Sequence, residues 1–143
     1  MNSDSFMLSR DYKFFEAARK AAGESTFRVH VGAVAVYGGK VIASAASMEK
    51  THPLQKQYNR YRSAGIEWVS PPKLHAEIGL LAKLKKMNVP MRDVSVYVYR
   101  ICKSRKQGMA RPCKACLVAL AESGIRNAWY TTDCGYAREW IAV

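Results

Sequence analysis

The chain has 143 residues, 49% of them hydrophobic, and a formal net charge of +12. This length predicts a single domain over residues 1–143, which can bury a core without disulfide bonds. No apolar run approaches the roughly 20 residues that span a bilayer, and the N-terminus lacks an export signal, so we expect no membrane partner and a cytoplasmic location.

The first part of the chain predicts a helix followed by a β-hairpin. Ser9 is a candidate cap for a helix in which apolar residues recur at helical spacing, and Gly23 would end it. Residues 28–37 and 40–47 predict two strands, and the two glycines at 38–39 predict a tight turn between them.

The rest of the chain predicts alternating helices and strands after a long loop. The loop covers residues 48–72 and contains three prolines. The later elements are a helix at 73–87, a strand at 94–102, a loop at 103–111, a helix at 113–123, a strand at 125–132 and a tail of either kind. A strand–helix–strand order requires a parallel strand pair. We therefore expect an α/β fold, a three-layer α/β/α sandwich on a mixed sheet of about five strands.

Two cysteines open the helix predicted at 113–123. Cys113 and Cys116 are three residues apart, so they share a helix face. The positive helix end lowers the pKa of a thiol and favours the thiolate, which is the form that binds metals. Alone, the pair also fits a redox CxxC motif or two ordinary buried thiols.

A histidine completes a candidate metal site. His75, early in the helix predicted at 73–87, would add an imidazole to the two thiolates. Structural zinc sites normally have four protein ligands, whereas catalytic sites keep one position for water. Cys102 falls in a predicted strand and Cys134 beyond the last one, so we expect neither as a fourth ligand. The three residues therefore predict a hydrolytic zinc centre.

Glu77 is the candidate catalytic residue. It is two residues from His75, too close to be a second ligand on the same helical face. A carboxylate in this place can instead move a proton between water and a leaving nitrogen.

The segments His75-Ala76-Glu77 and Pro112-Cys113-Lys114-Ala115-Cys116 resemble the HAE…PCxxC signature of the zinc-dependent cytidine and deoxycytidylate deaminase-like superfamily. The resemblance covers about residues 10–135. It implies a Zn(2+) cofactor, a cytidine-deaminase-like fold and hydrolytic deamination, with Glu77 protonating the ring nitrogen and then the departing ammonia. It also implies that the protein is a homo-oligomer.

Candidate substrate-binding residues lie around these motifs. Backbone groups near Ala76 and Arg111 would orient the base. Ser47 stands where many relatives carry an asparagine, and its hydroxyl could make part of the same contact. His52 would line the mouth of the pocket or form a turn, and His30 would lie near the site, packed or stacked on a base.

A basic loop leads to the metal-binding cysteines. It carries Lys103, Arg105, Lys106 and Arg111, with no acidic residue among them. Together with the net charge, it predicts an anionic nucleotide or a single-stranded nucleic acid as the substrate. A solvated basic surface is the alternative. A second basic stretch, within residues 56–68, is interleaved with aromatic residues, as is typical of single-strand binding.

Three functions fit these observations. The first is a zinc-dependent hydrolase that deaminates a cytosine-type base in a nucleoside or nucleotide. The second is the same chemistry on single-stranded DNA or RNA, or on adenosine in tRNA, although Arg111 replaces the glutamate usual in that last group. The third is a non-catalytic, zinc-stabilised nucleic-acid-binding module, which would require Cys102 or Cys134 as a fourth ligand and would leave Glu77 without a role.

Overall fold

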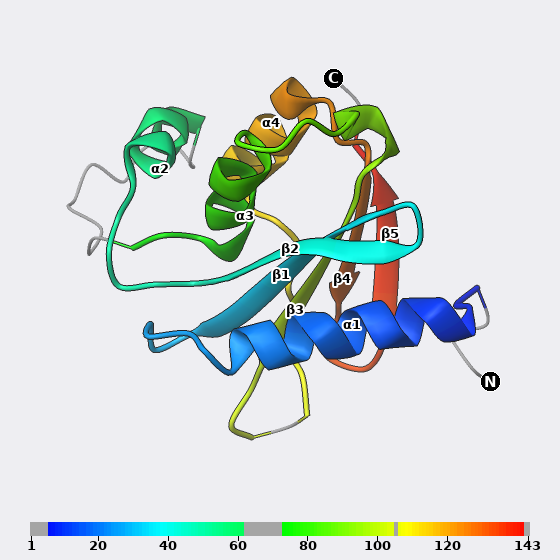
Figure 1. The fold of residues 1–143 in the computed structure, drawn as a ribbon. Helices are drawn as coiled ribbons and strands as arrows, with labels where there is room; N and C mark the ends of the chain where they lie inside the picture. Colours follow the sequence, from blue (N-terminus) through cyan, green and yellow to red (C-terminus); the bar gives the residue numbers. More distant parts are fainter. Residues whose placement is uncertain (1–5, 62–72, 105, 142–143) are drawn as a thin grey trace.

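The computed structural model describes residues 6–61, 73–104 and 106–141 (Figure 1). Its strands form one sheet in the order β2-β1-β3-β4-β5. The strands are β1 (His30–Tyr37), β2 (Lys40–Ala46), β3 (Ser95–Ile101), β4 (Asn127–Thr131) and β5 (Tyr136–Trp140). The helices are α1 (Ser9–Ala22), α2 (Pro53–Tyr58), α3 (Ala76–Leu84) and α4 (Lys114–Ser123), with short 3-10 turns η1 (Asn59–Tyr61) and η2 (Met91–Asp93).

Each face of the sheet has its own core, because successive side chains of a strand point to opposite faces. Val34 and Tyr97 pack with Phe15 of α1 on one face. Their neighbours Ala33 and Val98 pack on the other face, which α2, α3 and α4 cover. Figure 1 shows α1 alone on its side of the sheet, away from the other helices. The predicted three-layer α/β/α sandwich is therefore confirmed.

The sheet is mixed, as predicted. β1 is antiparallel to β2 and β3, β3 is parallel to β4, and β4 is antiparallel to β5. The tail, predicted to be either a helix or a strand, is the edge strand β5. The hairpin turn is confirmed too, because Gly38 and Gly39 have φ of 61° and 77°, the backbone that a two-residue type I′ turn requires.

The predicted cap of α1 is wrong. Ser9 is the first helical residue, and Leu8 takes the cap position. The reason is Asp11, whose carboxylate accepts the backbone N–H of Leu8 at 2.9 Å and the hydroxyl of Tyr97 at 2.7 Å. This buried carboxylate therefore fixes both the start of the helix and its position on β3.

Two predictions around the long loop are also wrong. The segment 48–72 contains α2, which begins at Pro53, and the part beyond residue 61 lies outside the described residues. The next helix begins at Ala76, not near residue 73, because Leu74 pairs with Met48 through two backbone hydrogen bonds of 2.8 and 2.9 Å. This bridge keeps the chain extended up to the helix. None of the described helices is long and apolar enough to cross a membrane.

Gly32 of β1 marks the closest approach between the sheet and α1. A Cβ at this position would lie 2.2 Å from the backbone oxygen of Ala18 and 2.2 Å from the backbone nitrogen of Ala22. The obstacle is backbone, so a change of rotamer cannot relieve it. Only glycine lets α1 lie this close to β1.

We expect Gly32→Ala to lower the free energy of unfolding by at least about 2 kcal/mol, since overpacking a core costs roughly 1–3 kcal/mol or more. Urea unfolding measures the change. The matched control is Gly79→Ala in α3, where a Cβ would meet its nearest neighbours at an ordinary 3.4 Å and the helix favours alanine. Equal urea midpoints for the two variants would contradict the close approach.

Candidate functional site

The starts of two helices bring the predicted metal-binding side chains together. His75 is the cap residue of α3 and Cys113 is the cap residue of α4. Cys116 lies in the first turn of α4 and is fully buried. The Nδ1 atom of His75 is 3.3 Å from the Sγ of Cys116 and 3.6 Å from the Sγ of Cys113. Segments about forty residues apart in the sequence thus meet in one site.

The three donor atoms fit a zinc ion. They all lie within 4.8 Å of one another. A tetrahedral site with Zn–S of about 2.3 Å and Zn–N of about 2.0–2.1 Å places nitrogen and sulfur about 3.6 Å apart. Both nitrogen–sulfur distances are close to this value. His75, Cys113 and Cys116 can therefore hold the zinc ion with little rearrangement.

No fourth donor joins this group in the part of the chain that the structure describes. Cys102 instead packs against Gly108, where an added Cβ would lie 2.4 Å from its Sγ. Cys134 is exposed between β4 and β5. A bound zinc ion would accordingly keep one position free of protein, as catalytic zinc sites do.

The electrostatics of the site favour metal binding. A hydrogen bond from Cys116, together with the contact and charge of His75, lowers the pKa of the Cys113 thiol to about 3 against the opposing effect of burial. Cys113 is consequently a thiolate at neutral pH. The thiolate is the form that binds zinc.

Glu77 lies in the same cavity as the metal-binding group. It is 5% exposed, and with His75 and Cys113 it lines a cavity of about 170 Å³. Burial raises the pKa of its carboxyl, His75 opposes this effect, and the Cys113 thiolate adds to it. A buried carboxyl with a raised pKa can both take up and release a proton in a reaction.

Gln55 of α2 supports the metal site, a role that sequence reasoning missed. Its side chain is 1% exposed. Its Oε1 accepts the backbone N–H of His75 at 2.9 Å, and its Nε2 donates to Asn59 at 2.8 Å. The hydroxyl of Tyr58 donates to Glu122 of α4 at 3.0 Å. Helix α2 thus connects to the starting residue of α3 and to α4.

His52 is the cap residue of α2 and is not among the residues that line the cavity. Its Nδ1 accepts the backbone N–H of Leu54 at 3.0 Å, and Pro53 fills the first helical position, where the missing N–H costs nothing. The turn interpretation of His52 matches this geometry. The same His-Pro pair is the sequence signal that could have revealed α2.

Ala76 and Ser47 both line the cavity. Ala76 is buried in the first turn of α3. The hydroxyl of Ser47 donates to the backbone oxygen of Val29 at 2.7 Å and accepts the N–H of Val31 at 3.1 Å. Ser47 therefore holds the chain that leads into β1, and its contact with a substrate stays a prediction.

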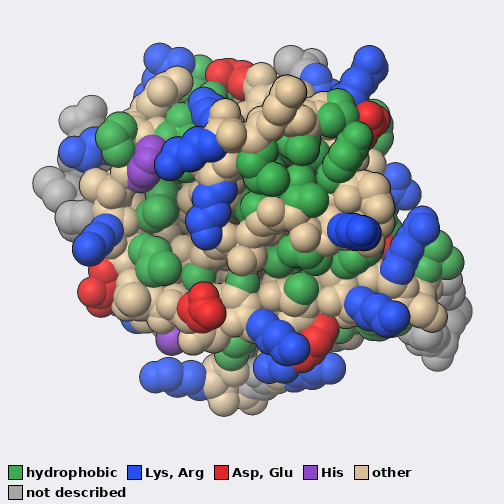
Figure 2. Space-filling view, in the orientation of Figure 1, with side chains coloured by type: hydrophobic (Ala, Val, Ile, Leu, Met, Phe, Trp, Pro, Cys, Tyr) green, Lys and Arg blue, Asp and Glu red, His purple; other side chains and the backbone are tan. Residues whose placement is uncertain are grey.

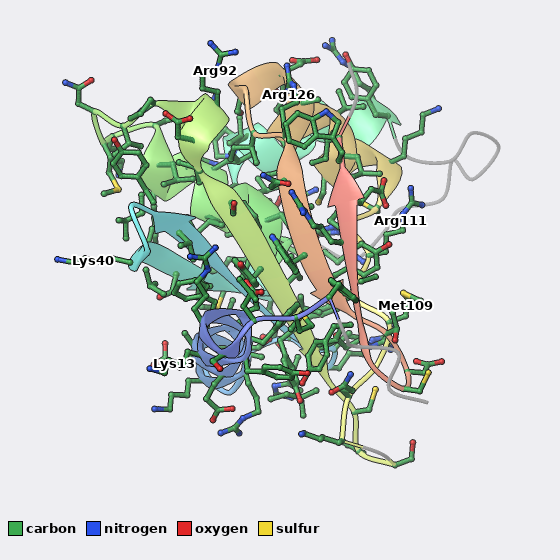
Figure 3. The ribbon with its side chains drawn as sticks, turned by 90° about the vertical axis from the view of Figure 1, so that its right-hand side faces the viewer. Lys13, Lys40, Arg92, Met109, Arg111 and Arg126 are labelled. Atoms are coloured by element: carbon green, nitrogen blue, oxygen red, sulfur yellow. The ribbon has the colours of Figure 1, made fainter. Side chains whose placement is uncertain are left out.

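Arg111 also lines the cavity, and its charge is paired. Its guanidinium donates to both carboxylate oxygens of Glu139 on β5, at 2.8 and 2.9 Å. The hydroxyl of Tyr130 donates to the same carboxylate at 3.3 Å. Figure 3 shows Arg111 and Met109 together on the β5 side of the molecule.

The remaining predicted residues lie elsewhere. His30 and Lys103 line a second cavity beside the first. Lys106 is exposed and lines neither of these two cavities. Arg105 lies outside the described residues.

We expect Gln55→Leu to weaken zinc binding about 10–100-fold, as is typical when a group that orients a metal ligand is lost. Competition with a chromogenic chelator measures the affinity. Gln57→Leu is the matched control, because Gln57 is exposed on the same helix. If the two variants hold zinc equally well, the hydrogen bond to His75 does not support the site.

The chain matches a protein-family model, and its fold is similar to those of solved structures. Residues 8–132 match the family model of the cytidine and deoxycytidylate deaminase zinc-binding region. The fold is similar to that of a cytidine deaminase from Burkholderia pseudomallei, with 17% identity, 94% of each chain covered and a TM-score of 0.62. It is also similar to that of a dCMP deaminase from the cyanophage S-TIM5 in apo form, with 18% identity, 88% of this chain and 86% of that chain covered, and a TM-score of 0.59.

No curated protein matches the chain in sequence. The family model nevertheless spans most of the chain, and it includes His75, Glu77, Cys113 and Cys116. The protein therefore belongs to the zinc-binding cytidine and deoxycytidylate deaminase family.

Proposed function

We propose that this protein is a zinc-dependent hydrolase that removes the amino group from a cytosine-type base. One observation carries the proposal. A three-donor metal site, with no fourth protein donor among the described residues, shares a small cavity with the buried carboxyl of Glu77. Three donors rather than four favour a catalytic site over the structural zinc of a non-catalytic module.

The reaction consumes water, whose oxygen becomes the carbonyl oxygen of the product, and releases the amino group as ammonia. Zinc, when bound, supplies a Lewis acid that makes water a better nucleophile near neutral pH. Glu77 accepts a proton from that water, delivers it to the ring nitrogen and later helps to protonate the departing amine. Ala76 and Arg111, which line the cavity, are the proposed neighbours of the base.

The size of the cavity supports a single-ring substrate. Its volume of about 170 Å³ is below the roughly 300 Å³ at which pockets begin to hold drug-sized ligands. A pyrimidine ring is a suitable occupant, and a sugar with its phosphate would extend beyond the cavity.

We expect Glu77→Gln to lower kcat by about 10²–10⁴-fold, the usual contribution of a general acid–base group, while the zinc content stays near one ion per chain. Ammonia release and metal analysis measure the two quantities. Glu16→Gln is the control, because Glu16 is an exposed residue of α1, on the other face of the sheet. Turnover at the wild-type rate in Glu77→Gln would refute the proposed proton transfer.

A screen for ammonia release tests the substrate. The panel contains cytidine, deoxycytidine, their monophosphates, adenosine and short single-stranded oligonucleotides. We expect turnover of one or more cytosine compounds, its loss when a chelator removes zinc, and its return when zinc is added. Activity on adenosine but on none of the cytosine compounds would contradict the proposal.

A further inference from the structure

A second cavity opens beside the proposed catalytic cavity. Its volume is about 660 Å³, and the two cavities share Val29 and Arg100 in their walls. It lies where β1 begins and β3 ends, since His30 pairs with Ile101 across these strands. A molecule whose base occupies the first cavity can therefore continue directly into the second.

The wall of the second cavity is basic. Arg28, Arg100 and Lys103 line it, and no acidic side chain does so among the described residues. No ion pair in the described part of the chain engages any of these three cations. In the view of Figure 2, Lys and Arg side chains lie along the lower edge of the molecule, near the loop after β3. Such a wall attracts phosphate groups.

The position of Arg100 is fixed by its surroundings. The backbone N–H of Gly108 donates to the Arg100 carbonyl at 3.0 Å, and the hydroxyl of Thr131 donates to the Gly108 carbonyl at 2.7 Å. An added Cβ on Gly108 would lie 3.3 Å from the side chain of Arg100, so this side chain packs on the returning loop. The shared wall at Arg100 is therefore held by β3 and by the contact with Gly108.

Aromatic rings accompany these charges. Phe27 lines the first cavity and His30 lines the second. Lys73 and Arg28 lie over the ring of Phe27, at 5.4 and 5.9 Å from its centre. Cations interleaved with rings suit single strands, whose backbone follows the charges and whose bases stack on the rings.

Resting on the proposed function, we propose that the substrate is a single-stranded nucleic acid. The target base enters the metal cavity, and the adjoining nucleotide occupies the second cavity with its phosphate against Arg28, Arg100 and Lys103. The sizes support this division, because the first cavity holds little more than a ring and the second falls within the roughly 300–1,000 Å³ of ligand pockets. A base stacked in a duplex could not enter the first cavity, which is why the strand is single.

A lone mononucleotide would leave most of this surface unused. Its one phosphate lies close to its own base, so Arg100 in the shared wall would be enough to bind that phosphate. Arg28 and Lys103, which line only the second cavity, serve a chain that continues past the target nucleotide.

Binding of a labelled oligonucleotide tests the proposal. The probes are fluorescein-labelled pentanucleotides with one central cytosine, in DNA and RNA forms, and fluorescence anisotropy measures their affinity. The protein is the full, zinc-loaded chain with Glu77→Gln, which prevents turnover. We expect tighter binding of either pentanucleotide than of dCMP, with an affinity that falls as salt rises, because phosphate contacts release counterions.

Two matched charge reversals locate the contact. We expect Lys103→Glu to weaken pentanucleotide binding at least fivefold and to lower the salt slope by about 0.7, the value for one phosphate contact of a single strand. Lys40→Glu is the control, with an expected change below twofold. Lys40 is an exposed lysine that pairs with Tyr37 at the far end of β1. The strand from His30 to Tyr37 is about 23 Å long at 3.3 Å per residue. Figure 3 places Lys40 on the opposite side of the molecule from Arg111.

The outcomes separate this inference from the proposed function. The inference is overturned if both pentanucleotides bind no better than dCMP, or if Lys103→Glu and Lys40→Glu act alike in proteins with unchanged melting temperatures. Wild-type protein that deaminates dCMP under those conditions would leave the proposed function standing. The converse outcome is tight pentanucleotide binding that depends on Lys103 in a protein that deaminates no cytosine compound. It would support strand binding in the second cavity and contradict the deaminase proposal.

Discussion

The site depends on two helix starts meeting closely enough for one metal ion to join them. The positive ends of α3 and α4 both point into this region, and a cap residue of each helix supplies a donor atom. Two positive ends so close together would repel each other if nothing negative lay between them. The Cys113 thiolate provides that charge. The helix ends in turn favour the ionised thiols that zinc requires.

Buried polar side chains hold this arrangement in place. Gln55 accepts the N–H of His75, and Ser47 bridges Val29 and Val31, so each secures a segment that lines the cavity. A buried polar group that lost its partner would cost about 1–3 kcal/mol. The backbone around the site is therefore fixed by the same interactions that satisfy these side chains.

Local patterns predicted most of the fold and the metal-binding residues. The alternation in β1 and β3, the glycine pair of the hairpin and the spacing of Cys113 and Cys116 all act within a few residues. Each can therefore be recognised without knowledge of the fold.

The features that sequence reasoning missed depend on distant contacts. The start of α3 is set by the pairing of Leu74 with Met48, and the role of Gln55 by a backbone group twenty residues away. The second cavity joins Arg28 to Lys103, which only the pairing of β1 with β3 brings together. Arg111 appeared in the sequence as one more cation, whereas Glu139 on β5 neutralises it.

The ion pair between Arg111 and Glu139 makes the distribution of charge around the metal cavity asymmetric. On the β5 side of the metal cavity the basic group is matched by a carboxylate, whereas on the side where β1 meets β3 the cations line an open cavity. A bound strand would therefore be held on one flank of the target base only. The 5′-to-3′ direction of the strand across the site would then be fixed. The nucleotide on that flank would be the neighbour whose identity affects binding.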